Sequence, residues 1–276
     1  MSKLSVMILC GRSPRHFYVA NRICAAARPV AIVLESGSQW NLHRLLQAVR
    51  PKALLRRAWR WLRDRRRYSG NREEEYFFGE RKAALERGDL SHEVPYINHP
   101  DVAALADRLQ PDVIAVFGTS LIRAPLLGKG RLGMVNLHGG LSPEYRGADC
   151  TFWALYNGEP EKIGCTLHFI DAGIDTGDLI AHVCPEIHDG DDELRAFWRA
   201  VRDSAEIYAE LFDRLETGER FDRKQSGPGQ LYRVRDRTWV RERQLARRMR
   251  DGLLRGVRLP ARVQWYNRAE RARDAR

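Results

Sequence analysis

Short apolar runs alternate with amphipathic segments along the first two thirds of the chain. The apolar runs have the length of strands, and the segments between them have helical spacing, with Gly11, Pro29, Pro111 and Gly118 marking turns. The predicted strands are 4–10, 30–34, 113–117, 134–137 and 165–170, and the predicted helices are 17–27, 102–109 and 152–157. Strands that alternate with helices predict an α/β fold with a mostly parallel sheet and helices on both faces.

The length of 276 residues is enough for one large domain with an appendage. We expect residues 1–220 to form this domain, with an Arg-rich helical insertion at about 41–72. Residues 221–276 are expected to form a basic, mainly helical C-terminal extension. Within it, 244–254 has the spacing of one helix, and 261–276 is expected to fray.

The net charge of +11 is concentrated in two segments. Residues 50–72 carry ten Lys or Arg and one acid, residues 233–276 carry fifteen Arg and five acids, and the remainder has a balance of −8. A nucleic-acid-binding protein usually spreads its charge over a folded face, so that class is not favoured. The apolar stripe of 41–67, which Pro51 should break or kink, favours a helix packed on the domain with a solvated basic face. Binding of an acidic ligand, a phosphate or an anionic membrane is the alternative.

The cysteines and the apolar segments point to a reducing compartment. Cys10, Cys24, Cys150, Cys165 and Cys184 form no C-x-x-C pair, which predicts buried free thiols. The N-terminal apolar run is too short for a signal peptide, and no stretch approaches the roughly 18 apolar residues of a membrane span. We therefore expect a cytoplasmic protein.

Polar side chains follow two of the predicted strands. Asn136 and His138 are two residues apart, so in a strand both project to the same side, and a Gly- and Pro-containing loop follows them. Asp175 lies in a glycine-flanked turn after strand 165–170. Each residue alone also has a structural explanation, as a hydrogen-bonded histidine or a turn-forming aspartate. Together, at the strand ends where open α/β sheets bind substrates, they predict an acyl-transfer site.

Three ordered motifs extend this pattern. They are Asn-x-His with a Leu-x-Pro-x-Tyr-Arg-Gly loop (136–147), Gly-x-Thr-x-His (164–168) and Asp-x-Gly-x-Asp-Thr-Gly (171–177). Over about 112–180 the chain resembles the folate-dependent formyltransferases, which include glycinamide ribonucleotide, methionyl-tRNA and amino-sugar N-formyltransferases. The resemblance implies a Rossmann-like domain that uses 10-formyltetrahydrofolate as co-substrate and needs no metal.

The resemblance also implies that Asn136, His138 and Asp175 are catalytic. When an amine attacks a formyl carbon, a tetrahedral centre with an oxyanion forms, and the Asn136 amide is suited to donate to that oxygen. His138 is suited to stabilise the same oxygen or to relay the amine proton, and Asp175 to orient His138 and relay the proton. His168 matches a recurrent family histidine, with either a catalytic or a bracing role. His138, His168 and Asp175 lack a recognisable metal-ligand spacing.

By the same resemblance, the pterin ring contacts three turns, whose backbone groups suit a planar ring with many donors and acceptors. The residues implied are Phe117, Gly118, Thr119, Leu121, Gly140, Leu141, Ser142, Pro143, Asp171, Ala172, Gly173 and Ile174. The Gly139-Gly140 pair stands where many relatives have Pro-Ser, which implies a loop that is more mobile or closer to its ligand.

Two departures from the family pattern reduce the number of acceptor classes to consider. The first turn, 11–16, lacks the Gly/Asn-rich phosphate loop of the glycinamide ribonucleotide enzyme, and 221–276 lacks the alternating strands of the tRNA enzyme's C-terminal barrel. The favoured acceptor is therefore a small primary amine, foremost a nucleotide-linked amino sugar, with Arg12, Arg15 and the 50–72 helix countering its diphosphate.

Several alternatives stay open. They are the tRNA reaction, the glycinamide ribonucleotide reaction, hydrolysis of the formyl folate, and a non-catalytic basic module with a vestigial folate site. A homodimer is compatible with the sequence. Contact of the Arg-rich segments with nucleic acid or an anionic membrane is also compatible, although it is not favoured.

Overall fold

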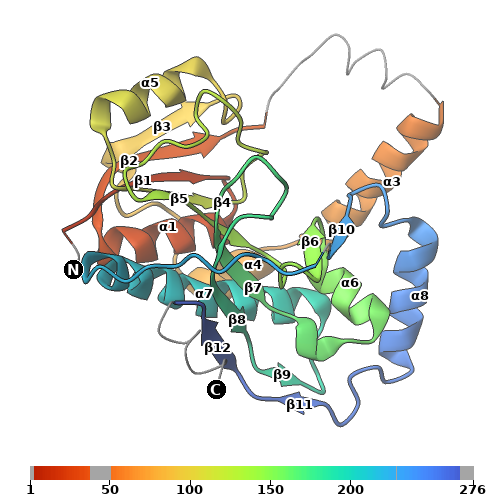
Figure 1. Ribbon diagram of the computed structural model, residues 1–276. Helices are drawn as coiled ribbons and strands as arrows, with labels where there is room; N and C mark the ends of the chain where they lie inside the picture. Colours follow the sequence, from red (N-terminus) through yellow and green to blue (C-terminus); the bar gives the residue numbers. More distant parts are fainter. Residues whose placement is uncertain (1–2, 38–50, 228, 268–276) are drawn as a thin grey trace, which may run out of the picture.

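An eight-stranded mixed sheet forms the centre of the computed structural model, which describes residues 3–37, 51–227 and 229–267 (Figure 1). The strand order is β12-β8-β7-β5-β4-β1-β2-β3. The strands are β1 (Ser5–Cys10), β2 (Arg28–Glu35), β3 (Ser91–Val94), β4 (Val113–Phe117), β5 (Gly133–His138), β7 (Cys165–Phe169), β8 (Leu179–Cys184) and β12 (Arg262–Trp265). All pairs from β3 to β5 are parallel, and β7, β8 and β12 add an antiparallel edge. The predicted α/β, Rossmann-like fold is confirmed.

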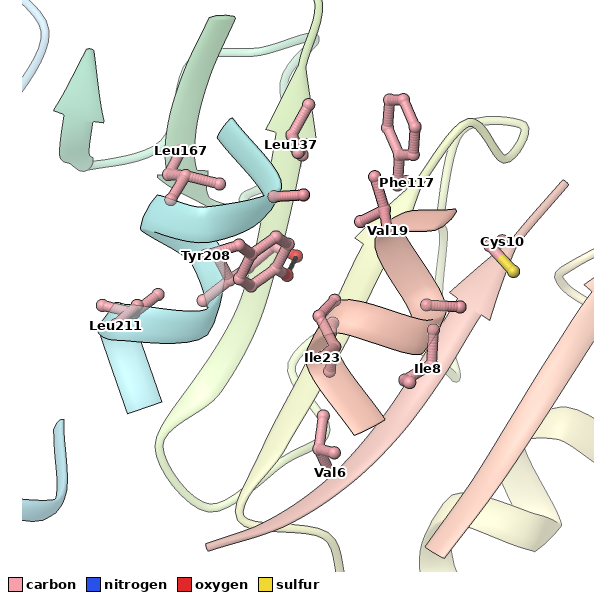
Figure 2. Packing of buried hydrophobic residues seen from close by; sticks show 14 of the residues in the cluster. Val6, Ile8, Cys10, Val19, Ile23, Phe117, Leu137, Leu167, Tyr208 and Leu211 are labelled. Carbon is pink, nitrogen blue, oxygen red and sulfur yellow. Dashed lines mark hydrogen bonds between the residues drawn. The ribbon is translucent and has the colours of Figure 1, made fainter. Parts of the chain in front are cut away.

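Helices cover both faces of the sheet. The helices are α1 (Pro14–Ala26), α3 (Pro51–Arg67), α4 (Arg72–Phe78), α5 (Pro100–Leu109), α6 (Cys150–Asn157), α7 (Glu193–Glu216) and α8 (Trp239–Arg250), with 3-10 turns at Gly88–Leu90 and Pro160–Lys162. Alternate residues of β1 divide between two cores: Val6, Ile8 and Cys10 pack with α1 and α7 (Figure 2), whereas Met7 and Leu9 pack with residues of α5. No helix in these described ranges is long and apolar enough to cross a membrane.

One buried tyrosine of α7 bonds to the backbones of the two strands whose ends carry the predicted site. Tyr208 is fully buried, and its hydroxyl accepts a hydrogen bond from the Val116 N–H of β4 at 3.2 Å. The same hydroxyl donates to the Val135 carbonyl of β5 at 2.6 Å. The hydroxyl thus bridges a buried donor of β4 and a buried acceptor of β5. Helix α7 therefore fixes β4 and β5 next to the site.

The C-terminal segment returns to the body of the protein. β10 (Gln230–Tyr232) pairs with β6 (Tyr145–Gly147), β11 (Arg258–Leu259) pairs with β9 (Ile187–His188), and β12 joins the edge of the main sheet beside β8. The expected fraying of 261–276 is wrong for β12, because this strand bonds to β8 and Trp265 is buried against Phe221. Residues 268–276 lie outside the described residues. The division at residue 220 stays a prediction.

The two predicted basic helices differ from expectation in their bounds. The insertion helix α3 begins at Pro51, the first-turn position that proline favours, and residues 41–50 lie outside the described residues. In the tail, the helix is Trp239–Arg250 rather than 244–254, because the Thr238 side chain caps it by accepting from the Arg241 N–H. Residues 251–256 form turns instead.

A buried arginine ties the C-terminal segment to the domain. Arg237 has a fully buried side chain that ion-pairs with Asp149 at 2.9 Å, Glu193 at 2.9 Å and Glu242 at 2.6 Å. Its guanidinium also lies 4.0 Å from the centre of the Phe152 ring. A buried charge needs such partners, and here they come from α7, α8 and the residue that precedes α6.

Candidate active site

A large cavity lies at the C-terminal ends of β4 and β5. Its volume is about 560 Å³, and its lining comes from four segments of the chain. These are 116–122 after β4, 136–139 at the end of β5, 168–175 after β7, and 231–234 in and after β10, with Gly147 and Ala148. This position at strand ends, next to the point where the strand order reverses, is where open α/β sheets bind ligands.

The structure brings the three predicted catalytic residues together in the wall of this cavity. The Nδ2 atom of Asn136 lies 3.5 Å from Oδ1 of Asp175, and Nδ1 of His138 lies 3.4 Å from Oδ2 of Asp175. His168 joins them, with Nε2 at 3.2 Å from the Asn136 amide nitrogen and 3.5 Å from Asp175 Oδ1. Asp175 is therefore flanked by two imidazoles and one amide.

Backbone carbonyls set the tautomers of both histidines. Nε2 of His138 lies 2.9 Å from the Tyr145 carbonyl, and Nδ1 of His168 lies 2.7 Å from the Phe169 carbonyl. Because a carbonyl can only accept, these two nitrogens carry the protons. In the neutral imidazoles the lone pairs of His138 Nδ1 and His168 Nε2 then face Asp175. The site thus combines several proton-accepting atoms with one side-chain donor, the Asn136 amide, and the backbone N–H of Gly147.

The turn after β7 is built to hold Asp175. Asp171 Oδ1 accepts from the Gly173 N–H at 3.0 Å and from the Thr176 hydroxyl at 2.7 Å, which closes the turn on itself. A side chain on Gly177 is impossible without movement, because its Cβ would lie 1.8 Å from the Phe169 carbonyl. Asp175 itself has a φ of +52°, a left-handed conformation that aspartate tolerates better than most residues.

Burial and neighbouring groups shift the pKa values of His138 and Asp175. Burial lowers the pKa of His138, against the opposing effect of the Asp175 carboxylate. Burial alone would raise the pKa of Asp175, but His138, His168 and the Gly147 N–H, which donates at 2.9 Å, bring it down to about 2. At neutral pH the pair is therefore a carboxylate beside an uncharged imidazole.

Seven of the twelve predicted folate-contacting residues line the cavity: Phe117, Gly118, Thr119, Leu121, Asp171, Gly173 and Ile174. Ala172 lies between two of them but does not line it. Gly140, Leu141, Ser142 and Pro143 also do not line it, and their contact with the ligand stays a prediction. They are packed behind His138, where the Ser142 N–H bonds to Thr166 and the Gly140 carbonyl accepts from the Thr166 hydroxyl.

Protein atoms lie very close to both glycines of the pair. A Cβ on Gly140 would lie 2.5 Å from the Tyr145 carbonyl and from the Cys150 Cβ. That carbonyl is the acceptor for His138, and the Cys150 thiol lies 3.6 Å from the same imidazole nitrogen. Sequence reasoning missed Tyr145 and Cys150 because their contribution comes from a backbone carbonyl and a buried thiol. All five cysteines are free and buried, as predicted.

The tail supplies a wall that was not predicted. Leu231, Tyr232, Arg233 and Val234 line the cavity because β10 runs beside β6. The contact requires Gly147, whose φ is +88° and whose Cβ would lie 2.2 Å from the Tyr232 carbonyl. The aromatic and branched apolar residues of Gln-Leu-Tyr-Arg-Val at 230–234 were the available sign of a strand in this Arg-rich segment.

The first turn, 11–16, holds the side chain of His16, and both arginines that were predicted to counter a diphosphate have partners within the protein. The His16 ring is buried against Gly11 and Gly118, and its Nδ1 accepts the Ser13 N–H at 3.2 Å, at the N-terminus of α1. The predicted counter-charges are also paired within the protein, Arg12 with Glu93 at 3.1 Å and Arg15 with Glu73 at 2.7 Å. In the described ranges no three His, Cys, Asp or Glu side chains are grouped to hold a metal ion.

Comparison with known proteins agrees with this geometry. Curated relatives include the methionyl-tRNA formyltransferases of Trichlorobacter lovleyi, 36% identical over 140 residues, and Geobacter metallireducens, 39% identical over 124 residues. These alignments cover 50% and 44% of this chain, and 44% and 39% of the relatives, so the chain matches less than half of their length.

Solved structures share the fold at low sequence identity. A 4-N formyltransferase from Francisella tularensis matches with a TM-score of 0.53 and 15% identity, and a sugar N-formyltransferase from Shewanella sp. with 0.55 and 13%. Each alignment covers 89% of this chain and 87% of the other. The sequence model of the family described as formyl transferase matches residues 31–210, a range that holds the Asn136, His138 and Asp175 cluster. The chain belongs to the formyl transferase family.

Proposed function

We propose that this protein is an N-formyltransferase that moves a formyl group from 10-formyltetrahydrofolate to a primary amine. The observation that carries the proposal is the cluster in the cavity wall, where one amide donor lies beside a carboxylate and two imidazole lone pairs. Formyl transfer to an amine needs these two functions next to each other. A donor must meet the oxygen that gains negative charge, and an acceptor must meet the proton that the amine loses.

The residues around the cavity fit the folate donor. Its lining is mainly apolar, and two of its large apolar side chains, Leu121 and Ile174, are 41% and 42% exposed. A planar ring in the cavity would cover this surface, and the backbone of the lining segment 117–120 carries donors and acceptors. When bound, the folate supplies the activated formyl group.

Each polar side chain then has one role. Asn136 donates its amide N–H to the formyl oxygen, a contribution of about 3 kcal/mol or more in comparable sites. His138 takes the amine proton on Nδ1, the nitrogen whose lone pair is free. Asp175, held as an anion, stabilises the imidazolium that results. His168 orients the Asn136 amide through its Nε2.

The acceptor that we favour is an amino sugar. The pairing of Arg12 and Arg15 with glutamates weakens the argument for a diphosphate at the first turn, and His16 at the N-terminus of α1 disfavours glycinamide ribonucleotide. Methionyl-tRNA is the second candidate, since relatives 36% and 39% identical over the matched residues carry that name.

The test has two stages. First, thermal unfolding is followed with and without 5-formyltetrahydrofolate, where ligand at a hundredfold over its Kd should add about 2.7 kcal/mol of stability. Second, mass spectrometry looks for N-formyl products from a panel of free and nucleotide-linked amino sugars, glycinamide ribonucleotide and methionyl-tRNA. The Asn136→Ala variant is the control for background transfer. Release of formate without any amine product would show a hydrolase instead.

A further inference from the structure

A second cavity adjoins the first behind the catalytic histidine. Its volume is about 240 Å³, and its lining shares Gly139 and Gly147 with the large cavity. Its other side chains come from the start of α1, the end of α3, the start of α6 and the start of α7. The six large ones are Arg15, Arg67, Tyr68, Asp149, Glu193 and Phe197. It therefore lies beside His138 on a side that the residues predicted for the folate do not occupy.

The charges that line this second cavity are neutralised by internal pairs. Arg67 bonds to Glu193 at 2.8 Å, Arg15 bonds to Glu73 at 2.7 Å, and Asp149 bonds to the buried Arg237. No guanidinium or carboxylate in this lining is left to meet a phosphate, so the cavity suits a polar group without net charge. The volume is below the roughly 300–1,000 Å³ of pockets that hold a drug-sized ligand, which fits a single ring better than a whole nucleotide sugar.

Two aromatic rings give the cavity an apolar wall. The Arg15 guanidinium lies 5.8 Å from the centres of both the Tyr68 and the Phe197 ring, and the Arg67 guanidinium lies 5.6 Å from that of Tyr68. Tyr68 directly follows α3, and 41% of it is exposed. Within the described ranges its hydroxyl has no hydrogen-bond partner. Aromatic faces combined with a hydroxyl and paired guanidinium groups suit a ring that has both C–H faces and hydroxyl groups.

We propose that this cavity is the acceptor subsite, and that the end of the Arg-rich insertion, through Tyr68, determines acceptor specificity. The subsite holds the uncharged, hydroxyl-rich ring of an amino sugar, and the amine reaches His138 between Gly139 and Gly147. This inference rests on the proposed N-formyltransferase function. The Arg-rich insertion would then contribute to the active site, whereas the sequence favoured a packed helix with a solvated basic face.

Tyr68→Ala tests the inference, and Trp61→Ala is a matched control. Trp61 is an aromatic residue of α3, the helix that Tyr68 directly follows, but it is 61% exposed and lies outside the lining of both cavities. The acceptor is the amino sugar that gives the most N-formyl product in the panel above. We expect Tyr68→Ala to raise the acceptor KM roughly tenfold while kcat and the KM for 10-formyltetrahydrofolate change less than twofold. Tyr68→Phe keeps the ring and should retain most of the affinity.

The outcomes separate the inference from the function on which it rests. If the wild-type protein formylates no amino sugar in the panel, both the acceptor class and the subsite are wrong. If it does, and Tyr68→Ala leaves the acceptor KM unchanged, only the subsite is wrong. An equal rise in KM for Trp61→Ala would place acceptor binding on the outer face of α3 and also overturn the inference. A 5-formyltetrahydrofolate-induced thermal shift equal to that of wild type verifies that each variant is folded.

Discussion

Replacing Asn136 by aspartate should convert the amide donor into a second carboxylate. In the structure Nδ2 of Asn136 lies 3.5 Å from Oδ1 of Asp175. Two unit charges at that separation repel by about 4.7 kcal/mol at an effective dielectric constant of 20. This equals about 3.5 pKa units, so the second proton of the pair should dissociate at about pH 7 instead of pH 4.

The pH dependence then distinguishes two states of Asn136→Asp. Above pH 8 both carboxylates are ionised and no donor faces the formyl oxygen, so kcat should be about 100- to 1,000-fold below wild type. Near pH 6 one carboxyl group is protonated, and its O–H restores a donor. We expect the ratio of variant to wild-type kcat to rise at least tenfold between pH 9 and pH 6. In Asn136→Ala, which has no group to protonate, the ratio should be low and constant.

The assay is the rate of N-formyl product formation at saturating 10-formyltetrahydrofolate, measured for wild type and both variants at each pH. Using ratios removes the pH dependence of the acceptor amine, which is the same for all three proteins. A constant ratio for Asn136→Asp between pH 6 and pH 9 would refute the assigned contact between residues 136 and 175. Wild-type activity in Asn136→Ala would refute the donor role itself.

Three further predictions concern the framework of the site. Gly147→Ala should disrupt the β6–β10 contact and abolish activity, whereas Gly158→Ala, with a similar φ of +77° but open space around it, should cost only about 1 kcal/mol in urea unfolding. Tyr208→Phe removes the hydroxyl that bonds to two buried backbone groups and should lower stability by about 1–3 kcal/mol by calorimetry, while Tyr18→Phe, whose hydroxyl lies at the surface, should change little. Burial lowers the pKa of His16 to about 3. As the pH falls from 6.5, the unfolded chain therefore takes up a proton on this imidazole before the folded chain does. The folded state is favoured most above pH 6.5 and loses stability from this group towards pH 3. Urea unfolding should show a slope that approaches about 1.4 kcal/mol per pH unit from this group between about pH 5.5 and pH 4, and His16→Gln should remove it.

The sequence was most informative where burial sets the pattern. The bounds of the five predicted strands agree with the structure within about two residues. An uninterrupted apolar run such as Val113–Phe117 is buried on both faces, and its two ends mark where the strand begins and ends. The tail was misjudged for the opposite reason. In β12, Trp265 faces the core and Val263 is 45% exposed, and four residues among many arginines give too short an alternation to identify a strand.

The candidate site divides in a similar way. The sequence pointed to Asn136, His138 and Asp175 because their side chains follow predicted strands, and the structure brings the three together; their catalytic role stays a prediction. The Tyr145 carbonyl, which sets the tautomer of His138, has no signature in the residue type. The turn at Gly140–Pro143 bonds to Thr166 behind His138, a contact that the motif did not indicate, because a motif records which residues are required and not which way they face.

The segment that contains β10 and β12 has two structural roles. It places Leu231–Val234 in the cavity wall and closes the edge of the sheet with β12, yet it contributes none of the catalytic side chains. During evolution, an exchange of this segment for another would therefore change the shape of the ligand site while leaving the catalytic groups untouched. Exchange of the C-terminal segment is then a simple way to change the substrate, in evolution and in protein engineering. Chimaeras joined just before β10 should inherit chemistry from one parent and selectivity, in part, from the other.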